Sequence, residues 1–267
     1  MKPALIFFFA LIIVIPASAQ FLNESHNTDE LIKANKVKSE TIYQSINSIG
    51  NRLNSIKNYD SSGILVSTKA FAFNNQVLSN DTFIYNNQYK CTKKIRFDKR
   101  GVLLDNYIYT YDEKGNQSLI EIFRNDTLLH SQKKIYNERN QRIIDSSKYG
   151  SGNYFESFLI FYDEEGLKTK TILKLNPDSA YITTFTYNKK KLLTEKHFKR
   201  IDSETVYTYY YNSHNQCKKE KKVTEKQGKT TETIVEYTYL PNGLLDKQEE
   251  YADDKAPKIL TYQYSYY

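Results

Sequence analysis

A short turn motif recurs through most of this chain and restricts the fold more than any other feature. An aromatic residue is followed by Asp or Asn, with Gly or Asn three positions after that, as in Tyr111–Gly115 and Tyr162–Gly166. The tyrosine that opens each unit, called the anchor tyrosine below, recurs every 24 to 28 residues, which indicates a repeat protein. The anchor tyrosines are Tyr59, Tyr85, Tyr111, Tyr136, Tyr162, Tyr187, Tyr211, Tyr239 and Tyr264.

The residues of the motif are those that a tight turn needs. Asp or Asn at its first position accepts a hydrogen bond from the backbone two residues later, and Gly or Asn at its fourth position adopts a positive φ at little cost. A type I turn followed by such a residue joins two strands as a hairpin with a G1 bulge. Pro241 in the unit of Tyr239 stands where a type I turn prefers proline. Each anchor tyrosine is therefore predicted to end a strand.

Strand-like alternation flanks the turns. From Tyr85 onward, the residue two positions before each anchor is aromatic or aliphatic, with Lys134 as the exception. The pattern predicts an all-β protein, an antiparallel meander of β-hairpin repeats with a period of about 25 residues. Because open sheets rarely exceed ~10 strands without curling, we expect a long curled or spiral sheet whose aromatic column lines the concave side. Full closure into a wide barrel is the alternative.

The first residues resemble a targeting segment. Lys2 is followed by an apolar run from Ala4 to Ile15 and by the small residues of 17–19, so residues 1–19 are predicted to be a secretory signal peptide. No later stretch is long and apolar enough for a transmembrane helix. We expect an exported protein, located in the periplasm, at the cell surface or outside the cell.

Residues 20–57 precede the repeat domain, which is predicted to span 58–267. Asp29 and Glu30 suit the positive end of a short helix. A four-three-four-three spacing of apolar residues then predicts a helical stripe that covers an edge or the mouth of the sheet, with partner binding as the alternative. The stripe consists of Ile42, Ile46, Ile49, Leu53 and Ile56.

Charge gives two interpretations of the surface. Lys and Arg number 38 against 31 Asp and Glu, a formal net charge of +7, and the densest lysine run is 218–222. The run fits a polyanion-binding surface, but interleaved acidic residues favour a solvated strand face. Charges at nearly every other position in 168–174 and 218–222 argue against a lipid-facing barrel wall. No nucleic-acid partner is expected.

The sequence offers no catalytic or cofactor motif, so we expect no enzyme activity, no cofactor and no metal site. Cys91 and Cys217 each lie six residues after an anchor tyrosine, in a slot that leucine fills elsewhere, and are predicted to be packing residues unless closure of the sheet pairs them. The histidines His26, His130, His197 and His214 lack metal-ligand spacing. The acidic residues 249–254 are predicted to be a solvated turn rather than a Ca²⁺ site.

The units Tyr111–Gly115 and Tyr162–Leu167, with Tyr59–Leu65 close behind, resemble the YD repeats of Rhs-type bacterial surface proteins. In that family the repeats build a β-sheet shell or spiral, often around a C-terminal effector domain, so the resemblance implies a sheet architecture over 59–264. This chain departs from the family in its longer period and in ending on a repeat without an effector. A toxin role is therefore not carried over.

The main functional hypothesis is an exported, non-enzymatic repeat protein whose β-sheet surface binds protein or polysaccharide at the bacterial envelope. The alternative is a closed β-sheet carrier that holds an apolar ligand, and a hydrolase of unknown type is the third possibility. Exposed aromatic and basic residues are the candidate binding groups. They are Tyr210, Lys218, Lys219, Lys221, Tyr266 and Tyr267.

Overall fold

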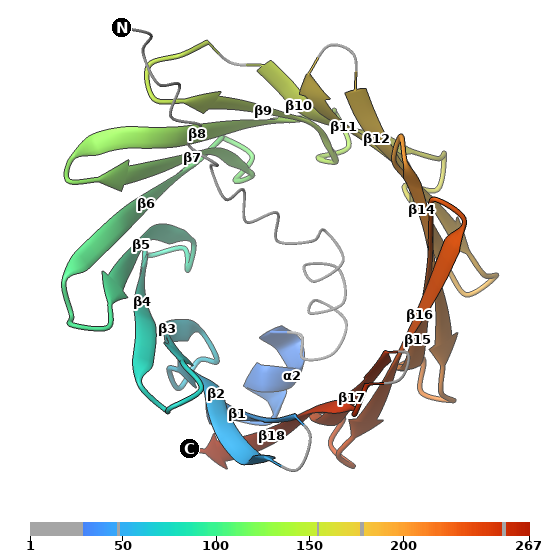
Figure 1. The fold of residues 1–267 in the computed structure, drawn as a ribbon. Helices are drawn as coiled ribbons and strands as arrows, with labels where there is room; N and C mark the ends of the chain where they lie inside the picture. The colour runs from blue at the N-terminus through green and yellow to red at the C-terminus, as the bar shows by residue number, and fades with distance from the viewer. Residues whose placement is uncertain (1–28, 47–48, 154, 177–178, 253–254) are drawn as a thin grey trace, which may run out of the picture.

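The chain forms one antiparallel sheet of 18 strands that closes on itself as a barrel (Figure 1). In this computed structural model, residues 29–46, 49–153, 155–176, 179–252 and 255–267 are described. Each strand pairs with its neighbours in sequence, and β1 pairs with both β2 and β18. The predicted all-β meander is confirmed. The prediction of an open curled or spiral sheet is wrong, because β1 and β18 satisfy each other's unpaired backbone groups and leave no edge.

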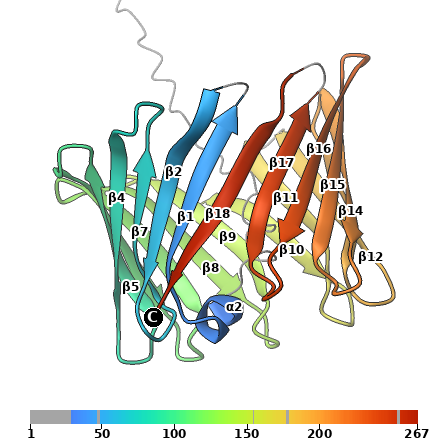
Figure 2. The same cartoon turned by 90° about the horizontal axis from the view of Figure 1, so that it is seen from below.

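The strands are seven to eleven residues long. Figure 2 shows them inclined to the barrel axis, with turns at both rims and α2 near one rim. In chain order the elements are α2 (Asp29–Ala34), β1 (Val37–Ile46), β2 (Ile49–Tyr59), β3 (Leu65–Phe71), β4 (Val77–Tyr85), β5 (Cys91–Asp98), β6 (Leu103–Tyr111), β7 (Gln117–Arg124), β8 (Thr127–Tyr136), β9 (Arg142–Tyr149), β10 (Phe155–Tyr162), β11 (Lys168–Asn176), β12 (Ser179–Tyr187), β13 (Leu193–Lys199), β14 (Ser203–Tyr211), β15 (Cys217–Lys226), β16 (Lys229–Tyr239), β17 (Leu245–Ala252) and β18 (Lys258–Tyr266).

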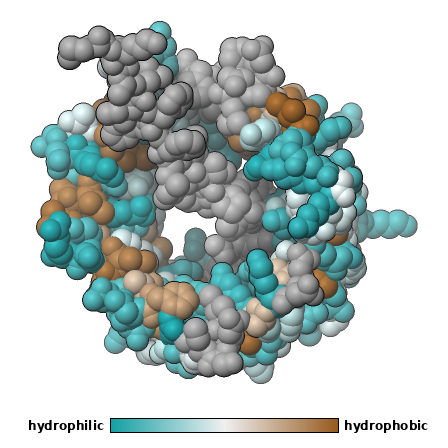
Figure 3. All heavy atoms as spheres, in the orientation of Figure 1, coloured by the Kyte–Doolittle hydropathy of each residue, from teal (hydrophilic) through white to brown (hydrophobic). Residues whose placement is uncertain are grey.

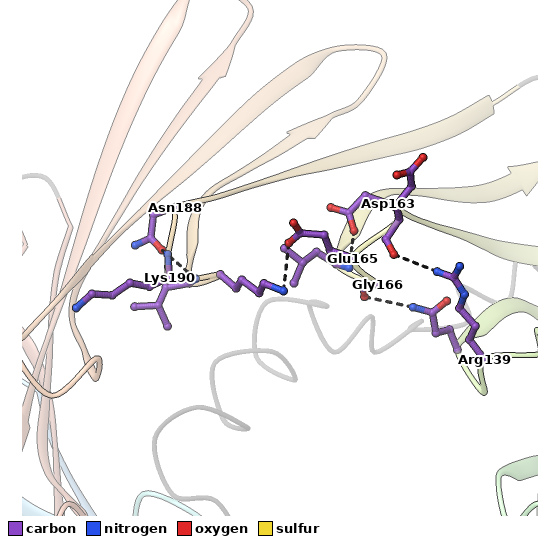
Figure 4. A network of polar contacts seen from close by, with 11 residues as sticks. Arg139, Asp163, Glu165, Gly166, Asn188 and Lys190 are labelled. Carbon is purple, nitrogen blue, oxygen red and sulfur yellow. Dashed lines mark hydrogen bonds and ion pairs between the residues drawn. The ribbon is translucent and has the colours of Figure 1, made fainter.

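The turns after the anchor tyrosines have the predicted chemistry. In the unit of Tyr111, the Asp112 carboxylate accepts a hydrogen bond from the backbone N–H of Asn116 at 2.7 Å, and Gly115 has a φ of 82°. The fourth turn position has positive φ in every unit from Tyr59 to Tyr239, even where it is Tyr89 or Lys191. Neighbouring turns also contact each other along the rim (Figure 4): Arg139 donates to the carbonyl of Glu164 at 3.1 Å. The turn assignment is therefore confirmed.

A second bulge follows each of these turns and sets which side chains face inward. Tyr211 lies opposite Cys217, but Tyr210 lies opposite Lys219, so Lys218 is an extra residue in β15. The same shift occurs beside every anchor from Tyr59 to Tyr239. An extra residue reverses the alternation of the faces. The position nine residues after an anchor therefore faces the same side as the anchor itself.

The anchor tyrosines face the inside of the barrel and link consecutive units. Tyr59 and Tyr264 pack around α2, which lies within the ring of strands (Figure 1). From Tyr85 to Tyr264, each anchor hydroxyl donates to the carbonyl of the residue six positions after the preceding anchor, at 2.6 to 3.0 Å. Tyr267 donates to the carbonyl of Tyr59 at 2.6 Å across the closure. The prediction of an inward aromatic column is confirmed.

The helix before the sheet is shorter than the sequence pattern predicts. In the described part of the chain, only Asp29–Ala34 is helical; Ile32 is buried there against Val37 and Leu244. The stripe residues Ile42, Ile46, Ile49, Leu53 and Ile56 lie in β1 and β2, so the predicted helical segment 20–57 is wrong over 37–57, and its boundary falls inside β2. The physical reason is that this segment pairs with two strands that would otherwise remain edges, which outweighs two heptads of helical spacing. The signal-peptide prediction for 1–19 lies outside the described residues.

Substituting Gly166 by Val should destabilise the barrel by at least ~1–2 kcal/mol, because a side chain at positive φ is strained. Gly166 has a φ of 83°, and an added Cβ would lie 2.9 Å from Nε2 of Gln141. The reverse change, Tyr89→Gly at a φ of 59°, should stabilise by up to ~1 kcal/mol. Gly50→Val is the control, since nothing lies within 4 Å of its added Cβ. Urea unfolding measures all three, and an equal loss at Gly50 and Gly166 would contradict the turn explanation.

Candidate functional site

The inner wall of the barrel is the concave surface of the molecule. A ring of 18 strands is ~27 Å across from backbone to backbone before strand tilt widens it. Barrels of this strand number are too wide for wall side chains alone to fill. Figure 3 shows hydrophilic and hydrophobic residues around the ring and an open gap within it. Ligand sites are concave, so the inner wall is the first place to look for one.

Buried ionisable groups lie along this wall. In an antiparallel sheet, opposite residues share a face, so register partners of the inward tyrosines are also inward. Glu40 lies opposite Tyr264, and Glu220 lies opposite the buried Tyr209. A buried charge is costly unless it has a partner, so the partners of these groups determine what the wall can bind. The buried charged residues are Glu40, Asp81, Asp105, Asp145, Lys196 and Glu220.

On one side of the barrel, protein groups neutralise these charges. Asp81 on β4 accepts two hydrogen bonds from the Arg96 guanidinium at 2.9 and 3.0 Å, and the ammonium of Lys94 lies 3.8 Å from the same carboxylate. Asp105 on β6 accepts two from Arg124 at 2.9 and 3.3 Å. Such bidentate pairs are among the strongest polar contacts in proteins. On this side of the wall, the buried carboxylates therefore have their partners within the protein.

Within the described residues, the wall at β13–β15 lacks such bidentate pairs. Lys196 on β13 is 6% exposed, and its ammonium lies 3.8 Å from the centroid of the Tyr207 ring. The ammonium of Lys222 on β15 lies 5.8 Å from the same ring. Glu220 is also 6% exposed, and its Oε2 has no hydrogen-bond donor among the described residues. We call Lys196, Tyr207, Glu220 and Lys222 the inner-wall cluster.

The pKa values of this cluster reflect its burial. Burial raises the pKa of Glu220 to about 7, while Lys196 and Lys222 act against the rise. Burial lowers the pKa of Lys196 to about 8, with Glu220 acting against the fall and Lys222 adding to it. Perturbed groups of this kind gather at functional sites, although structural clusters can show them too.

The residues predicted from the sequence to bind a partner lie elsewhere. Tyr210, Lys219 and Lys221 are on the outer face of β14 and β15, and Lys218 is the exposed bulge residue. Lys219 and Lys221 form ion pairs with glutamates of β16, at 3.8 and 2.8 Å. Tyr210 is 43% exposed. The structure brings these four residues together as one outer patch.

The two remaining candidates lie at the end of the chain. Tyr266 ends β18 and is exposed. Tyr267 donates to the carbonyl of Tyr59, and its backbone N–H donates to the carbonyl of Lys36 at 3.0 Å. These contacts give Tyr267 a role in closing the barrel. Neither residue joins the outer patch, which is on β14 and β15.

Sequence reasoning missed the inner-wall cluster. It treated the run 218–222 as one surface, whereas the bulge at Lys218 turns Lys219 and Lys221 outward and Glu220 and Lys222 inward. The recurring turn motif was the available signal. Because a bulge follows each turn, the number of residues after an anchor tyrosine determines which side chains face the inner wall. Lys196 lies nine residues after Tyr187 and could have been placed in this way.

Among the described residues, which exclude His26, the cysteines and histidines form no shared site. Cys91 and Cys217 are free and lie on β5 and β15. Cys217 packs in a buried hydrophobic cluster, as predicted, whereas Cys91 is only half-buried. His197 lies beside Glu204, and the ring centroid of His130 lies 5.0 Å from that of Tyr149. Among the described residues, no three His, Cys, Asp or Glu side chains gather as a possible metal site. Within the same residues, no helix is long and apolar enough to cross a membrane.

Comparisons with known proteins give structural similarities only. No protein-family model matches the chain, and no curated protein matches it. Among solved structures, it is similar to a porin-like protein from Bacteroides uniformis, with 12% identity over 86% of this chain and 98% of the other and a TM-score of 0.46. It is also similar to a chain in the structure of TcdB2-TccC3-Cdc42, with 8% identity over 82% of this chain and 14% of the other and a TM-score of 0.35.

Proposed function

We propose that this chain is an exported, non-enzymatic protein of the bacterial envelope that binds a polar partner, protein or polysaccharide, on the inner wall of its barrel. The observation that carries the proposal is the buried Glu220 beside Lys196 and Lys222, where no carboxylate of the described residues pairs with either lysine. Buried polar groups normally have partners. A bound partner would supply them here.

The non-enzymatic part of the proposal rests on what the recurrent aspartates do. Asp60, Asp112 and Asp163 each accept backbone hydrogen bonds within their own turns. These carboxylates therefore maintain the fold, and the most regular acidic feature of the sequence needs no catalytic explanation. The YD-repeat resemblance adds an expected place at the bacterial surface, which is also part of the proposal.

The proposed location is an aqueous compartment of the envelope or the envelope surface. Export rests on the signal-like residues 1–19. The outer face of β15–β17 carries the ion pairs Lys219–Glu236, Lys221–Glu232 and Lys247–Glu249. A lipid-facing band must be apolar. These pairs favour a water-exposed outer face.

A carrier for an apolar ligand is the weaker alternative. Closure of the sheet gives the enclosed shape that such a carrier needs. However, Asp81, Asp105 and Glu220 are buried on the inner wall, and an apolar cargo would remove remaining water from them without offering hydrogen bonds. A partner with polar groups fits the wall better.

A steric block on the inner wall should abolish partner binding. Thr183 on β12 lies opposite the inward Phe198, whereas its neighbour Thr184 lies opposite the outward His197. We expect Thr183→Trp to weaken binding at least about tenfold, a loss of 1.4 kcal/mol, and Thr184→Trp to leave it unchanged. The exported full chain would be tested on envelope polysaccharide and protein fractions. Loss with Thr184→Trp alone would place the site on the outer face.

A further inference from the structure

Two repeat units carry a lysine at the same position of the repeat, and the two side chains have nearly the same surroundings. Lys94 lies nine residues after Tyr85, and Lys196 lies nine residues after Tyr187. Each ammonium lies over the ring of an inward tyrosine on the next strand, Lys94 at 3.6 Å from the Tyr107 centroid and Lys196 at 3.8 Å from that of Tyr207. The two sites can therefore be compared group by group.

The counter-charge differs between these sites. Lys94 lies 3.8 Å from the carboxylate of Asp81, which stands four residues before the anchor tyrosine. At Lys196 the corresponding residue is Thr183. Asp105, six residues before the next anchor, is likewise replaced by Thr205. The second site keeps the lysine and the aromatic ring but has lost both carboxylates.

Other groups of the second site increase its need for an anion. Lys222 adds a second ammonium beside Tyr207. Neither Lys196 nor Lys222 has a carboxylate within ion-pair distance among the described residues, although Glu220 lies on the same wall. Glu220 is buried, and its Oε2 has no hydrogen-bond donor in this part of the chain. Among the described residues, the site therefore lacks a carboxylate paired with its lysines and a donor for Oε2 of Glu220.

We propose, on the basis of the proposed function, that the inner-wall cluster binds an acidic polysaccharide of the uronic-acid class, whose carboxylate takes beside Lys196 and Lys222 the place that Asp81 takes beside Lys94. A uronic acid carries a carboxylate and hydroxyl groups on one ring. The carboxylate accepts hydrogen bonds from the lysines, and a hydroxyl donates to Glu220.

An acidic protein segment fits this site less well. Ionised aspartate and glutamate side chains accept hydrogen bonds but cannot donate them, so they do not supply the donor that Oε2 of Glu220 lacks. An extended peptide would gain affinity by adding a strand to a sheet edge. The barrel has no such edge, because β1 and β18 pair along their length. A saccharide supplies the donor and needs no edge.

The test uses the exported full chain and two forms of one polymer, oligogalacturonate and its methyl ester, which lacks the charge. Titration calorimetry should show the acid form binding at least about tenfold more tightly than the ester. Lys196→Met should remove that preference. Lys221→Met, a lysine on the outer face of β15, is the matched control and should preserve the preference.

Different outcomes separate this inference from the proposed function. Equal binding of acid and ester, or an unchanged preference in Lys196→Met, overturns the acidic saccharide while a Thr183→Trp block still supports binding on the inner wall. Tighter binding of polyglutamate, lost in Lys196→Met, overturns it in favour of an acidic protein. If the wild-type chain binds no envelope polysaccharide or protein fraction, both proposals fail.

Discussion

Replacing Glu40 by alanine should lower the unfolding free energy by about 3 kcal/mol, the lower end of the cost of removing one partner from a buried ion pair. Glu40 is 1% exposed and lies on β1. Its Oε2 accepts hydrogen bonds from the Lys57 ammonium at 3.2 Å and from the Tyr59 hydroxyl at 3.0 Å. The lower end applies because Lys57 is 36% exposed and water can solvate part of its charge after the change.

Two milder substitutions give the controls for Glu40. Tyr59→Phe removes one hydrogen bond and should cost about 1.5 kcal/mol, the lower end for a hydrogen bond to a charged group. Glu40→Gln keeps an oxygen acceptor and should fall between Tyr59→Phe and Glu40→Ala. Urea unfolding at neutral pH measures all three. A loss below ~1 kcal/mol in Glu40→Ala would mean that Glu40 is hydrated and that the contacts with Lys57 and Tyr59 contribute little.

The closure between β1 and β18 can be examined in the same experiment. Thr41 on β1 and Gln263 on β18 lie opposite each other. Cysteines placed at these two positions should form a disulfide in the wild-type background, since opposite residues of paired strands lie close together. If Glu40→Ala acts by loosening the closure, cross-linking should restore most of its lost stability. No restoration would place the effect within the β1–β2 hairpin.

The repeat could be predicted from the sequence because each unit carries its own local reason to fold. Asp112 and Gly115 determine a turn through two adjacent requirements, a side-chain acceptor and a positive φ. The anchor hydroxyls add a link between units that spacing alone does not reveal. Tyr162, for example, donates to the carbonyl of Arg142 at 2.8 Å.

Closure could not be predicted in the same way, because it depends on contacts between the two ends of the chain. Ile42 and Ile56 fit a helical stripe when read locally. In the barrel, Ile42 lies opposite Tyr262 on the inner side and Ile56 opposite Thr41 on the outer side. The non-local gain of pairing β1 with β18 decides the outcome, and no window of sequence contains both strands.

Which residues form the candidate site depends on one extra residue in β15. Strict alternation from the inward Cys217 would turn Lys219 and Lys221 inward, and the bulge at Lys218 reverses this. An interpretation based on exposed lysines therefore chose the opposite face of the same strand. The charge composition was visible in the sequence, but the face on which each charge lies was not.

The stability of the barrel should pass through a minimum between pH 7 and 8, caused by Glu220 and Lys196. The folded pKa of Glu220, about 7, lies above its ordinary value of 4.5, so the stability that it contributes is present below pH 4.5 and is lost as the pH rises through 7. The folded pKa of Lys196, about 8, lies below 10.5, so its contribution is present above pH 10.5 and is lost as the pH falls through 8.

Each group should change the unfolding free energy by on the order of 3 kcal/mol across its own window. Other groups also titrate, so the informative quantity is the difference between the wild type and Glu220→Gln at each pH. Because the amide carries no charge, the variant should gain stability relative to the wild type from pH 5 to pH 7.5. Lys196→Met should show its advantage at pH 7.5 and lose part of it by pH 9.5.

Urea unfolding at these three pH values distinguishes a buried cluster from a hydrated one. If the unfolding free energies of the wild type and Glu220→Gln run parallel between pH 5 and 7.5, Glu220 titrates as in the unfolded chain. That result would contradict the interpretation of the inner-wall cluster as a site. Diverging curves would show that the fold bears a real cost in keeping these charges on the wall. Since turns and tyrosine links do not need that cost, this result would support the proposed binding of a partner at the cluster.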